Sequence, residues 1–338
     1  MKRVLLFLLL ISNLYAANLP EKAVLLLNVK GVINVGSASF IERGIELAEK
    51  NNAELVIIKL DTPGGLLNST RQIVQKINQS KIPVGVYVAP GGASATSAGT
   101  IITMSAHIAA MAPGTNIGAA HPVGGQGEDI KGKMDEKATN DTAAFIRAQA
   151  KLRNRNTEWA EQAIRKSVSA TADEALKLNV VDFLAVDLDA FVKQVNYANA
   201  KPVGKSVVEI QMTLAEKVLL FLGDPNISYL LMVAGGLGLY VEITSPGVVL
   251  PGVLGAICLV LAFLSFATLP VNYGAVALLV LGLMFLIAEI FVTSYGVLTI
   301  GGILSLVLGS IFLMDPSTGD LSLSLALVIP IIAALTTI

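Results

Sequence analysis

The strongest constraint on the fold is the uneven distribution of positive charge along the chain. All 24 Lys and Arg residues lie at or before Lys217, and the last 121 residues contain none. Long apolar runs fill this second part, and each has close to the ~20 residues that cross the hydrocarbon core of a bilayer. The runs cover residues 227–243, 248–269, 275–292, 297–314 and 321–338. The sequence therefore predicts an all-α, multi-pass transmembrane region of about five helices over residues 227–338.

The first 217 residues have the charge balance of a soluble domain. They carry 24 basic and 20 acidic side chains, although the whole chain is 54% hydrophobic and only 14% charged. This small positive excess gives no indication of a nucleic-acid partner. The only cysteine, Cys258, lies in an apolar run, which excludes disulfides, cysteine-zinc clusters and thiol catalysis. No cofactor and no metal are expected.

The N-terminus has the pattern of an export signal. Lys2 and Arg3 precede an apolar run at residues 4–14, and Ala16 and Ala17 are small residues of the kind found at cleavage sites. Residues 1–17 are predicted to be a signal peptide, with an uncleaved anchor as the alternative because the residues just before the cut are bulky. Export places the soluble domain outside the cytoplasm, which is the periplasm if the source is a Gram-negative bacterium. The membrane loops give no second indication of orientation, since they lack Lys and Arg.

Apolar runs of strand length alternate with amphipathic helix patterns over residues 18–195. The strand-like runs are residues 23–29, 55–60, 84–88, 108–111 and 180–186, and one intervening helix is expected to bury Leu66, Leu67, Ile73, Val74 and Ile77. This alternation predicts an α/β domain with a mainly parallel sheet. Residues 119–141, rich in Gly, Lys and acids, read as a long mobile loop, and helices are expected to resume at about Thr142.

Residues 196–226 are predicted to connect the two parts of the chain. They begin with a linker containing Pro202 and Gly204 and continue with a strand-like run at 207–211. Residues 213–222 are amphipathic, which is typical of a helix lying at a membrane surface.

The stretch 91–100 (Gly-Gly-Ala-Ser-Ala-Thr-Ser-Ala-Gly-Thr) is the best candidate for chemistry. It follows a strand-like run, and small residues around Ser97 suggest a tight strand-to-helix turn that leaves the hydroxyl accessible. The first free N–H groups of the following helix would then stabilise a developing oxyanion. Taken alone, such a stretch is more often a loop without chemistry.

Three segments taken together resemble the ClpP/crotonase superfold, and most closely the long-form NfeD membrane serine proteases. They are residues 61–65 (Asp-Thr-Pro-Gly-Gly), 95–100 (Ala-Thr-Ser-Ala-Gly-Thr) and 111–119 (Met-Ala-Pro-Gly-Thr-Asn-Ile-Gly-Ala). A later helix at about 170–176 fits the same family, and the resemblance covers roughly residues 23–195. It implies a ClpP/crotonase-like protease domain followed by the membrane region.

The resemblance also implies a Ser/Lys dyad. Ser97 corresponds to the nucleophile, Lys137 to the base, and the backbone N–H groups of Gly65, Gly64 and Ala98 to the oxyanion hole. A serine hydroxyl is a poor nucleophile until a base removes its proton. A lysine serves as that base when an apolar cleft disfavours its charged form.

Other residues near these motifs offer alternatives. Lys131 and Lys133 lie on the same predicted loop as Lys137, and either is the base if the alignment is shifted. Ser94 is interpreted as a turn residue and Asp61 as a residue that shapes its own turn. His107 is expected at a strand entrance and His121 at the cleft rim, with no pattern that indicates a Ser/His/Asp triad. These two histidines are all that the chain contains.

The membrane half contains a weak internal repeat. Glu242 precedes Gly247 and Gly252 much as Glu289 precedes Gly296 and Gly301. An acid inside an apolar run usually faces a bundle interior or a polar cavity. A structural role near helix ends is the preferred interpretation of the two glutamates, and a functional polar site is the alternative.

The function implied is that of a membrane-anchored serine endopeptidase that cleaves apolar peptide segments. The family resemblance suggests a stomatin/prohibitin-type protein in the same bilayer as partner, and assembly into a homo-oligomer. Two alternatives are degradation of remnant signal peptides with the same dyad and a non-catalytic membrane scaffold. Long-form relatives usually end in an OB-like domain, and no function of such a domain is expected for residues 1–338.

Overall fold

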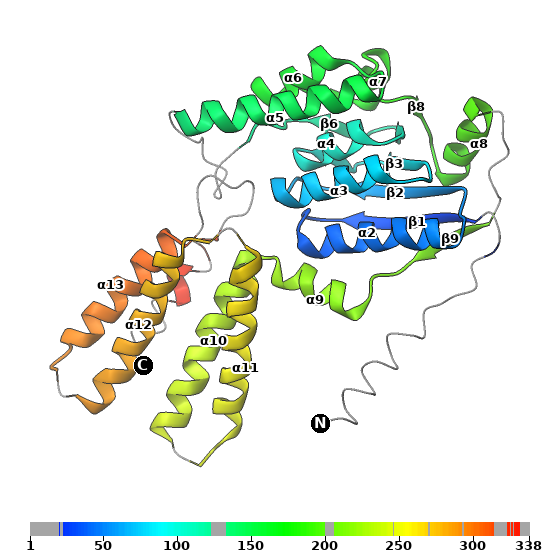
Figure 1. Ribbon diagram of the computed structural model, residues 1–338. Helices are drawn as coiled ribbons and strands as arrows, with labels where there is room; N and C mark the ends of the chain where they lie inside the picture. The colour runs from blue at the N-terminus through cyan, green and yellow to red at the C-terminus, as the bar shows by residue number, and fades with distance from the viewer. Residues whose placement is uncertain are drawn as a thin grey trace.

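The computed structural model describes an α/β domain followed by a set of apolar helices (Figure 1). The described residues are 20, 23–122, 133–199, 206–245, 247–269, 271–292 and 294–313, with 323, 324, 326 and 328–331 near the C-terminus. The expected signal peptide lies outside them.

A six-stranded parallel sheet forms the centre of the first part. Its strands are β1 (Val24–Lys30), β2 (Leu55–Asp61), β3 (Val84–Val88), β5 (Ile108–Met111), β8 (Phe183–Leu184) and β9 (Val207–Ile210). They lie in the order β8-β5-β3-β2-β1-β9, and every neighbouring pair is parallel. The expected α/β class with a mainly parallel sheet is confirmed.

Helices cover both faces of this sheet. They are α2 (Val35–Lys50), α3 (Leu67–Gln79), α4 (Ala98–Ser105), α5 (Lys133–Leu152), α6 (Thr157–Arg165), α7 (Ala172–Lys177) and α8 (Leu188–Asn199). Alternate residues of each strand enter opposite layers. Leu25 and Leu27 pack in the larger core with α2, α3 and α4, whereas Val24 and Leu26 pack with Phe191 of α8.

A second sheet has three strands, the first of which follows β3 in the sequence. It consists of β4 (Ser94–Thr96), β6 (Asn116–Gly118) and β7 (Ser169–Thr171). β6 pairs with β4 in parallel and with β7 in antiparallel orientation. This small sheet joins two of the three motifs singled out in the sequence.

Two local expectations are wrong. α5 begins at Lys133 rather than near Thr142, because the residues after Gly132 are mostly good helix formers with no Gly or Pro. Leu66 is the extended N-cap of α3 rather than part of its buried helical face, and it belongs to a different buried cluster from Ile73, Val74 and Ile77. Leu66 packs in one buried cluster with Tyr229, Met232 and other residues of the apolar second part of the chain.

The described residues of the connection between the two parts form a strand and a helix. β9 pairs with β1, so the sheet continues past the expected domain boundary at residue 195. We therefore propose that the soluble domain extends to Ile210. α9 (Leu214–Leu222) follows, and its capping box consists of Thr213 and Glu216.

The helices of the second part are α10 (Pro225–Thr244), α11 (Leu250–Thr268), α12 (Tyr273–Phe291) and α13 (Val297–Ile311). They form two hairpins, α10–α11 and α12–α13 (Figure 1). Among the described residues, α10 and the Leu250–Ala267 part of α11 are long and apolar enough to cross a membrane, while α12 and α13 contain shorter apolar helices. The fifth expected run, 321–338, lies largely outside the described residues.

Glu289 has a structural role at a helix end. Its carboxylate accepts hydrogen bonds from the Ser294 hydroxyl at 2.6 Å and from the N–H groups of Gly296 and Thr299, both at 3.1 Å. It thereby caps the start of α13, where helical N–H groups lack internal acceptors. The preferred interpretation of this glutamate fits the structure.

Candidate active site

Ser97 lies on a sharp turn between β4 and α4. Its backbone has φ 51° and ψ −111°, a combination that residues with a side chain rarely adopt. Its N–H donates to the Gly118 carbonyl at 3.1 Å, and its own carbonyl accepts from Thr100 and Ile101 of the first helical turn. This strand–turn–helix geometry projects the half-buried hydroxyl from the start of α4, as the sequence predicts.

The 61–65 turn lies directly beside β4. The Thr62 N–H donates to the Ser94 carbonyl at 2.7 Å, and the Thr62 carbonyl accepts from the Thr96 N–H at 3.1 Å. A Cβ on Gly99 would lie 2.7 Å from the Thr62 methyl, so a glycine is required at that close approach. Thr62 thus binds the glycine turn to the turn that carries Ser97.

The two glycines of the turn differ in what their N–H groups do. Gly64 donates to the Thr62 hydroxyl at 3.1 Å. Gly65 forms a parallel bridge with Ile33, in which the flanking residues Gly64 and Leu66 make both hydrogen bonds to Ile33 at 2.8 Å. The N–H of Gly65 therefore points to the opposite side, away from Ile33.

The third motif is locked to α4 by a buried hydroxyl. Thr100 Oγ1 lies 2.8 Å from the Ala95 carbonyl and 2.9 Å from the Gly118 carbonyl, and it accepts the Gly118 N–H at 3.0 Å. Gly118 has φ 134°, and a Cβ there would lie 2.3 Å from the Val168 carbonyl oxygen. The structure thus brings together all three sequence motifs.

The N–H groups at the start of α4 are available for an anion. Ala98 and Gly99 begin the helix, where N–H groups have no helical acceptor, and no described residue accepts a hydrogen bond from either. Ala98 therefore leaves a backbone donor without a described acceptor directly after Ser97.

Lys137 lies on the exposed side of the first turns of α5, which packs against α4. It makes no hydrogen bond or ion pair with any described residue. The structure therefore shows Ser97, Ala98 and the glycine turn together but not a Ser97–Lys137 contact. Lys133 is the first residue of α5, with a side chain outside the description, and Lys131 lies outside the described residues.

Ser94 and Asp61 have structural contacts. Ser94 lies in β4 rather than in a turn, and its hydroxyl donates to Asn116 Oδ1 at 2.8 Å. Asp61 Oδ1 accepts the Ser94 N–H at 3.2 Å, so it shapes the local geometry as expected. No three His, Cys, Asp or Glu side chains of the described residues are placed to hold a metal ion.

Neither histidine is placed as the base of a Ser/His pair with Ser97. His121 Nδ1 is 2.8 Å from the Ile164 carbonyl, which fixes it beside α6. His107 lies just before β5, past the end of α4 opposite to Ser97, and its Nδ1 accepts the Val84 N–H at 3.2 Å. Burial, with a contribution from Arg153 and Arg155, lowers the pKa of His107 to about 4.

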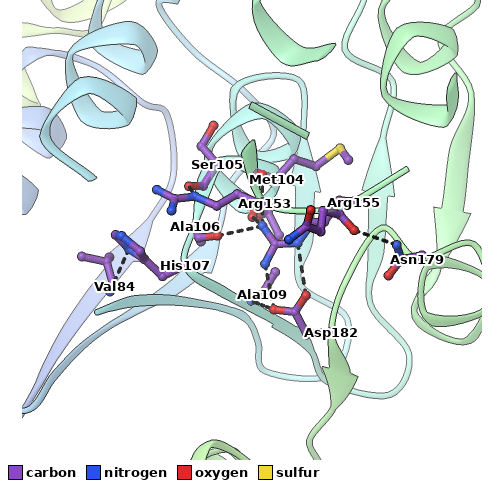
Figure 2. A network of polar contacts seen from close by, with 12 residues as sticks. Val84, Met104, Ser105, Ala106, His107, Ala109, Arg153, Arg155, Asn179 and Asp182 are labelled. Carbon is purple, nitrogen blue, oxygen red and sulfur yellow. Dashed lines mark hydrogen bonds and ion pairs between the residues drawn. The ribbon is translucent and has the colours of Figure 1, made fainter. Parts of the chain in front are cut away.

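A guanidinium network closes the far end of α4 (Figure 2). Arg155, 5% exposed, donates to the carbonyls of Met104 and Ala106 at 3.0 and 2.7 Å and pairs with Asp182 at 2.7 Å. Arg153 donates to the Ser105 carbonyl at 2.8 Å. Cations at a helix C-terminus complement the helix dipole, whose positive end lies at Ser97.

Sequence reasoning missed Thr62, Thr100 and Arg155. The two threonines lie inside the recognised motifs, and their position among small residues is a signal that a buried hydroxyl is needed there. Arg155 has no local signal, because the carbonyls it binds lie about 50 residues earlier in the chain.

Two family models match the chain. The NfeD1b N-terminal domain matches residues 23–212, and the NfeD integral membrane domain matches residues 226–338. Together they cover the α/β domain and the apolar helices described above.

Individual proteins and solved structures match as well. The chain is 37% identical to the membrane-bound protease PH1510 of Pyrococcus horikoshii over 327 residues, which cover 93% of this chain and 74% of that protein. Among solved structures, a lysine-to-alanine mutant of the 1510-N membrane-bound stomatin-specific protease in complex with a substrate peptide has a TM-score of 0.53 and 38% identity, covering 59% of this chain and 97% of that one. A serine-to-alanine mutant of the same protease has a TM-score of 0.53 and 39% identity, covering 58% of this chain and all of that one.

Proposed function

Because the chain belongs to the NfeD family of membrane-bound serine proteases, we propose that it cleaves apolar peptide segments of a stomatin/prohibitin-type membrane protein with a Ser97/Lys137 dyad. One observation carries the assignment of Ser97. It is the serine at the strained strand-to-helix turn where the three motifs meet.

In this mechanism the Ser97 Oγ attacks the scissile carbonyl while the Lys137 Nζ accepts the hydroxyl proton. The protonated amine then donates a proton to the leaving amine, and an acyl-enzyme remains on Ser97. Water, activated by the same amine, releases the second product. No cofactor takes part.

The oxyanion of the tetrahedral intermediate needs N–H donors aimed at it before the reaction begins. We assign this role to Gly65 and Ala98. Gly64, the third residue expected from the family resemblance, has the weaker claim because its N–H already donates to Thr62.

Lys137 requires a covered environment to act as a base, since water favours a charged amine. It is exposed in the isolated chain. A bound substrate segment or a neighbouring subunit of a homo-oligomer supplies the apolar cover in this proposal. If the neighbouring subunit supplies it, activity should depend on the assembly state of the enzyme.

The bilayer is the second partner in the proposal. α9 exposes Leu214, Val218 and Phe221 to 78%, 42% and 56%, and their spacing places them on one face. Such a face suits the interface of a membrane with the protease domain beside it. The multi-pass arrangement and the extracytoplasmic side of the domain are part of the same proposal.

The test is cleavage of a stomatin-type C-terminal peptide by the full chain in detergent. Ser97→Ala and Lys137→Ala should each abolish cleavage, whereas the matched controls Ser94→Ala and Lys133→Ala should retain it. Full activity of Ser97→Ala would refute the nucleophile assignment. Loss of activity in Lys133→Ala with retention in Lys137→Ala would move the base by four residues.

A remnant signal peptide, offered to the same enzyme preparation, tests the substrate class. The proposal predicts the higher kcat/KM for the stomatin-type peptide. A higher value for the signal peptide would assign the enzyme to signal-peptide degradation instead.

A further inference from the structure

The end of α9 joins the membrane helices to the glycine turn of the active site. The last four carbonyls of a helix lack internal partners. In α9, Leu219 and Phe221 satisfy theirs with the N–H groups of Gly223 and Asp224. The remaining two carbonyls bind side chains from opposite parts of the molecule.

The Leu220 carbonyl is bound by the soluble domain. Asn34 Nδ2 donates to it at 3.0 Å, while Asn34 Oδ1 caps α2 by accepting the N–H groups of Gly36 and Ser37 at 2.9 and 3.3 Å. The approach is close, since a Cβ on Gly36 would lie 2.3 Å from the Leu220 nitrogen. Asn34 is 2% exposed, so the joint between α2 and α9, which is the Asn34–Leu220 hydrogen bond, is shielded from water.

The Leu222 carbonyl is bound by the membrane helices. The Ser265 hydroxyl of α11 donates to it, and the Ser228 hydroxyl of α10 lies 3.5 Å away. Ser228 and Ser265 also hydrogen-bond to each other. A shift of α10 and α11 therefore moves the end of α9 directly.

Asn34 adjoins the residue that holds the glycine turn. Ile33 is bridged to Gly65, and a Cβ on Gly65 would lie 2.1 Å from the Ile33 carbonyl oxygen. Leu66, on the other side of Gly65, is 7% exposed and packs in one cluster with Tyr229 and Met232 of α10. The neighbours of the Ile33–Gly65 bridge, Asn34 and Leu66, thus contact α9 and α10 respectively.

From these contacts we propose that Asn34 and Leu66 are positioning residues, through which the membrane helices hold the Gly65 N–H at the oxyanion. The inference rests on the proposed function, because it assigns a determinant of the same oxyanion hole. The membrane domain then contributes to the rate of the chemical step in addition to anchoring the enzyme.

Asn34→Asp in the full chain tests the joint. Asp is as good an N-cap as Asn, but it cannot donate to the Leu220 carbonyl. We expect kcat for the stomatin-type peptide to fall about 10-fold or more, with KM changed less than about twofold, because small misplacement of an oxyanion donor acts on the transition state.

The matched control is Asn156→Asp. Asn156 caps α6 in the same way, accepting the Trp159 N–H and donating to the Leu178 carbonyl, both at 2.9 Å, without contact to the membrane helices. Its kcat and KM should stay within about twofold of the parent. Because Asn34 is 2% exposed and Asn156 is half-buried, Asn34→Asp should have the lower thermal midpoint by Trp159 fluorescence. A midpoint well above the assay temperature in both variants separates positioning from a general loss of stability.

Gly223→Ala is a second, independent variant. An added Cβ would lie 2.2 Å from Asn34 Nδ2, so it displaces the joint while every group of the soluble domain remains. It should reproduce the kcat loss of Asn34→Asp. Parental kcat in both variants would overturn the inference. Ser97→Ala, measured in parallel, separates failure of the coupling from failure of the proposed function. If kcat is parental in Asn34→Asp and Gly223→Ala while Ser97→Ala is inactive, only the coupling is refuted. If Ser97→Ala is active, the proposed function is refuted.

Discussion

The backbone of Ser97 stores strain that a glycine would release. Residues with a side chain in such sparsely populated conformations cost about 1–3 kcal/mol, and Ser97 has φ 51° and ψ −111°. Its hydroxyl makes no capping hydrogen bond at α4. Replacing Ser97 by Ala therefore keeps the strain and removes little else, while Ser97→Gly removes the strain.

The size of the effect follows from two opposing terms. Glycine gains the relief of about 1–3 kcal/mol and loses about 0.4–1 kcal/mol through the greater entropy of its unfolded chain. We expect Ser97→Gly to be more stable than Ser97→Ala by up to about 2.6 kcal/mol, with a midrange of about 1.3 kcal/mol. Both variants should be inactive, so the serine that the reaction needs makes the domain less stable than a glycine at this position would.

Urea unfolding of the full chain in detergent, followed by Trp159 fluorescence, measures this difference. Trp159 is the only tryptophan and is buried in the soluble domain, so it reports on that domain alone. The control pair is Gln75→Ala and Gln75→Gly on the exposed face of α3, where Gly should be the less stable by about 1 kcal/mol. If the Gly variant were less stable than the Ala variant at position 97 as well as at position 75, the strain at Ser97 would be refuted.

Two further predictions concern the far end of α4. Arg155→Met should destabilise the domain by about 3 kcal/mol, because it removes the guanidinium that binds two buried carbonyls and pairs with Asp182. As the control, Arg165→Met removes an exposed pair with Glu161 and should change the urea midpoint little. For His107, a pKa lowered from 6.5 to about 4 means that the unfolded chain binds the proton first. The unfolding free energy should therefore decline as pH falls from 6.5 to 4, by about 1–3 kcal/mol after solvent screening. His107→Gln should remove this contribution to the slope of unfolding free energy against pH. An unchanged slope in the variant would contradict the prediction.

The features that local sequence carries were predictable. Small residues around Ser97 and the Gly64–Gly65 pair indicate turns because only small or glycine residues fit such backbones. Strand and helix runs followed from apolar periodicity. The apolar last third of the chain was evident from the absence of Lys and Arg.

The features that depend on distant contacts were not predictable. β9 pairs with β1 across about 180 residues, and nothing in the 207–210 run specifies that partner. Leu66 looks like a helix-face residue in the sequence, but its position at the N-cap of α3 turns it towards the membrane helices. The Asn34–Leu220 joint and the Arg155 network have the same non-local origin.

The most direct test of the central claim is to trap the acyl-enzyme. The full chain is incubated with an activated ester of the stomatin-type peptide, quenched in acid and digested, and the acylated residue is located by mass spectrometry. The mechanism predicts acylation of Ser97 in the parent, none in Ser97→Ala, and much slower acylation in Lys137→Ala. Acylation at Ser94, or peptide cleavage by Ser97→Ala, would contradict it.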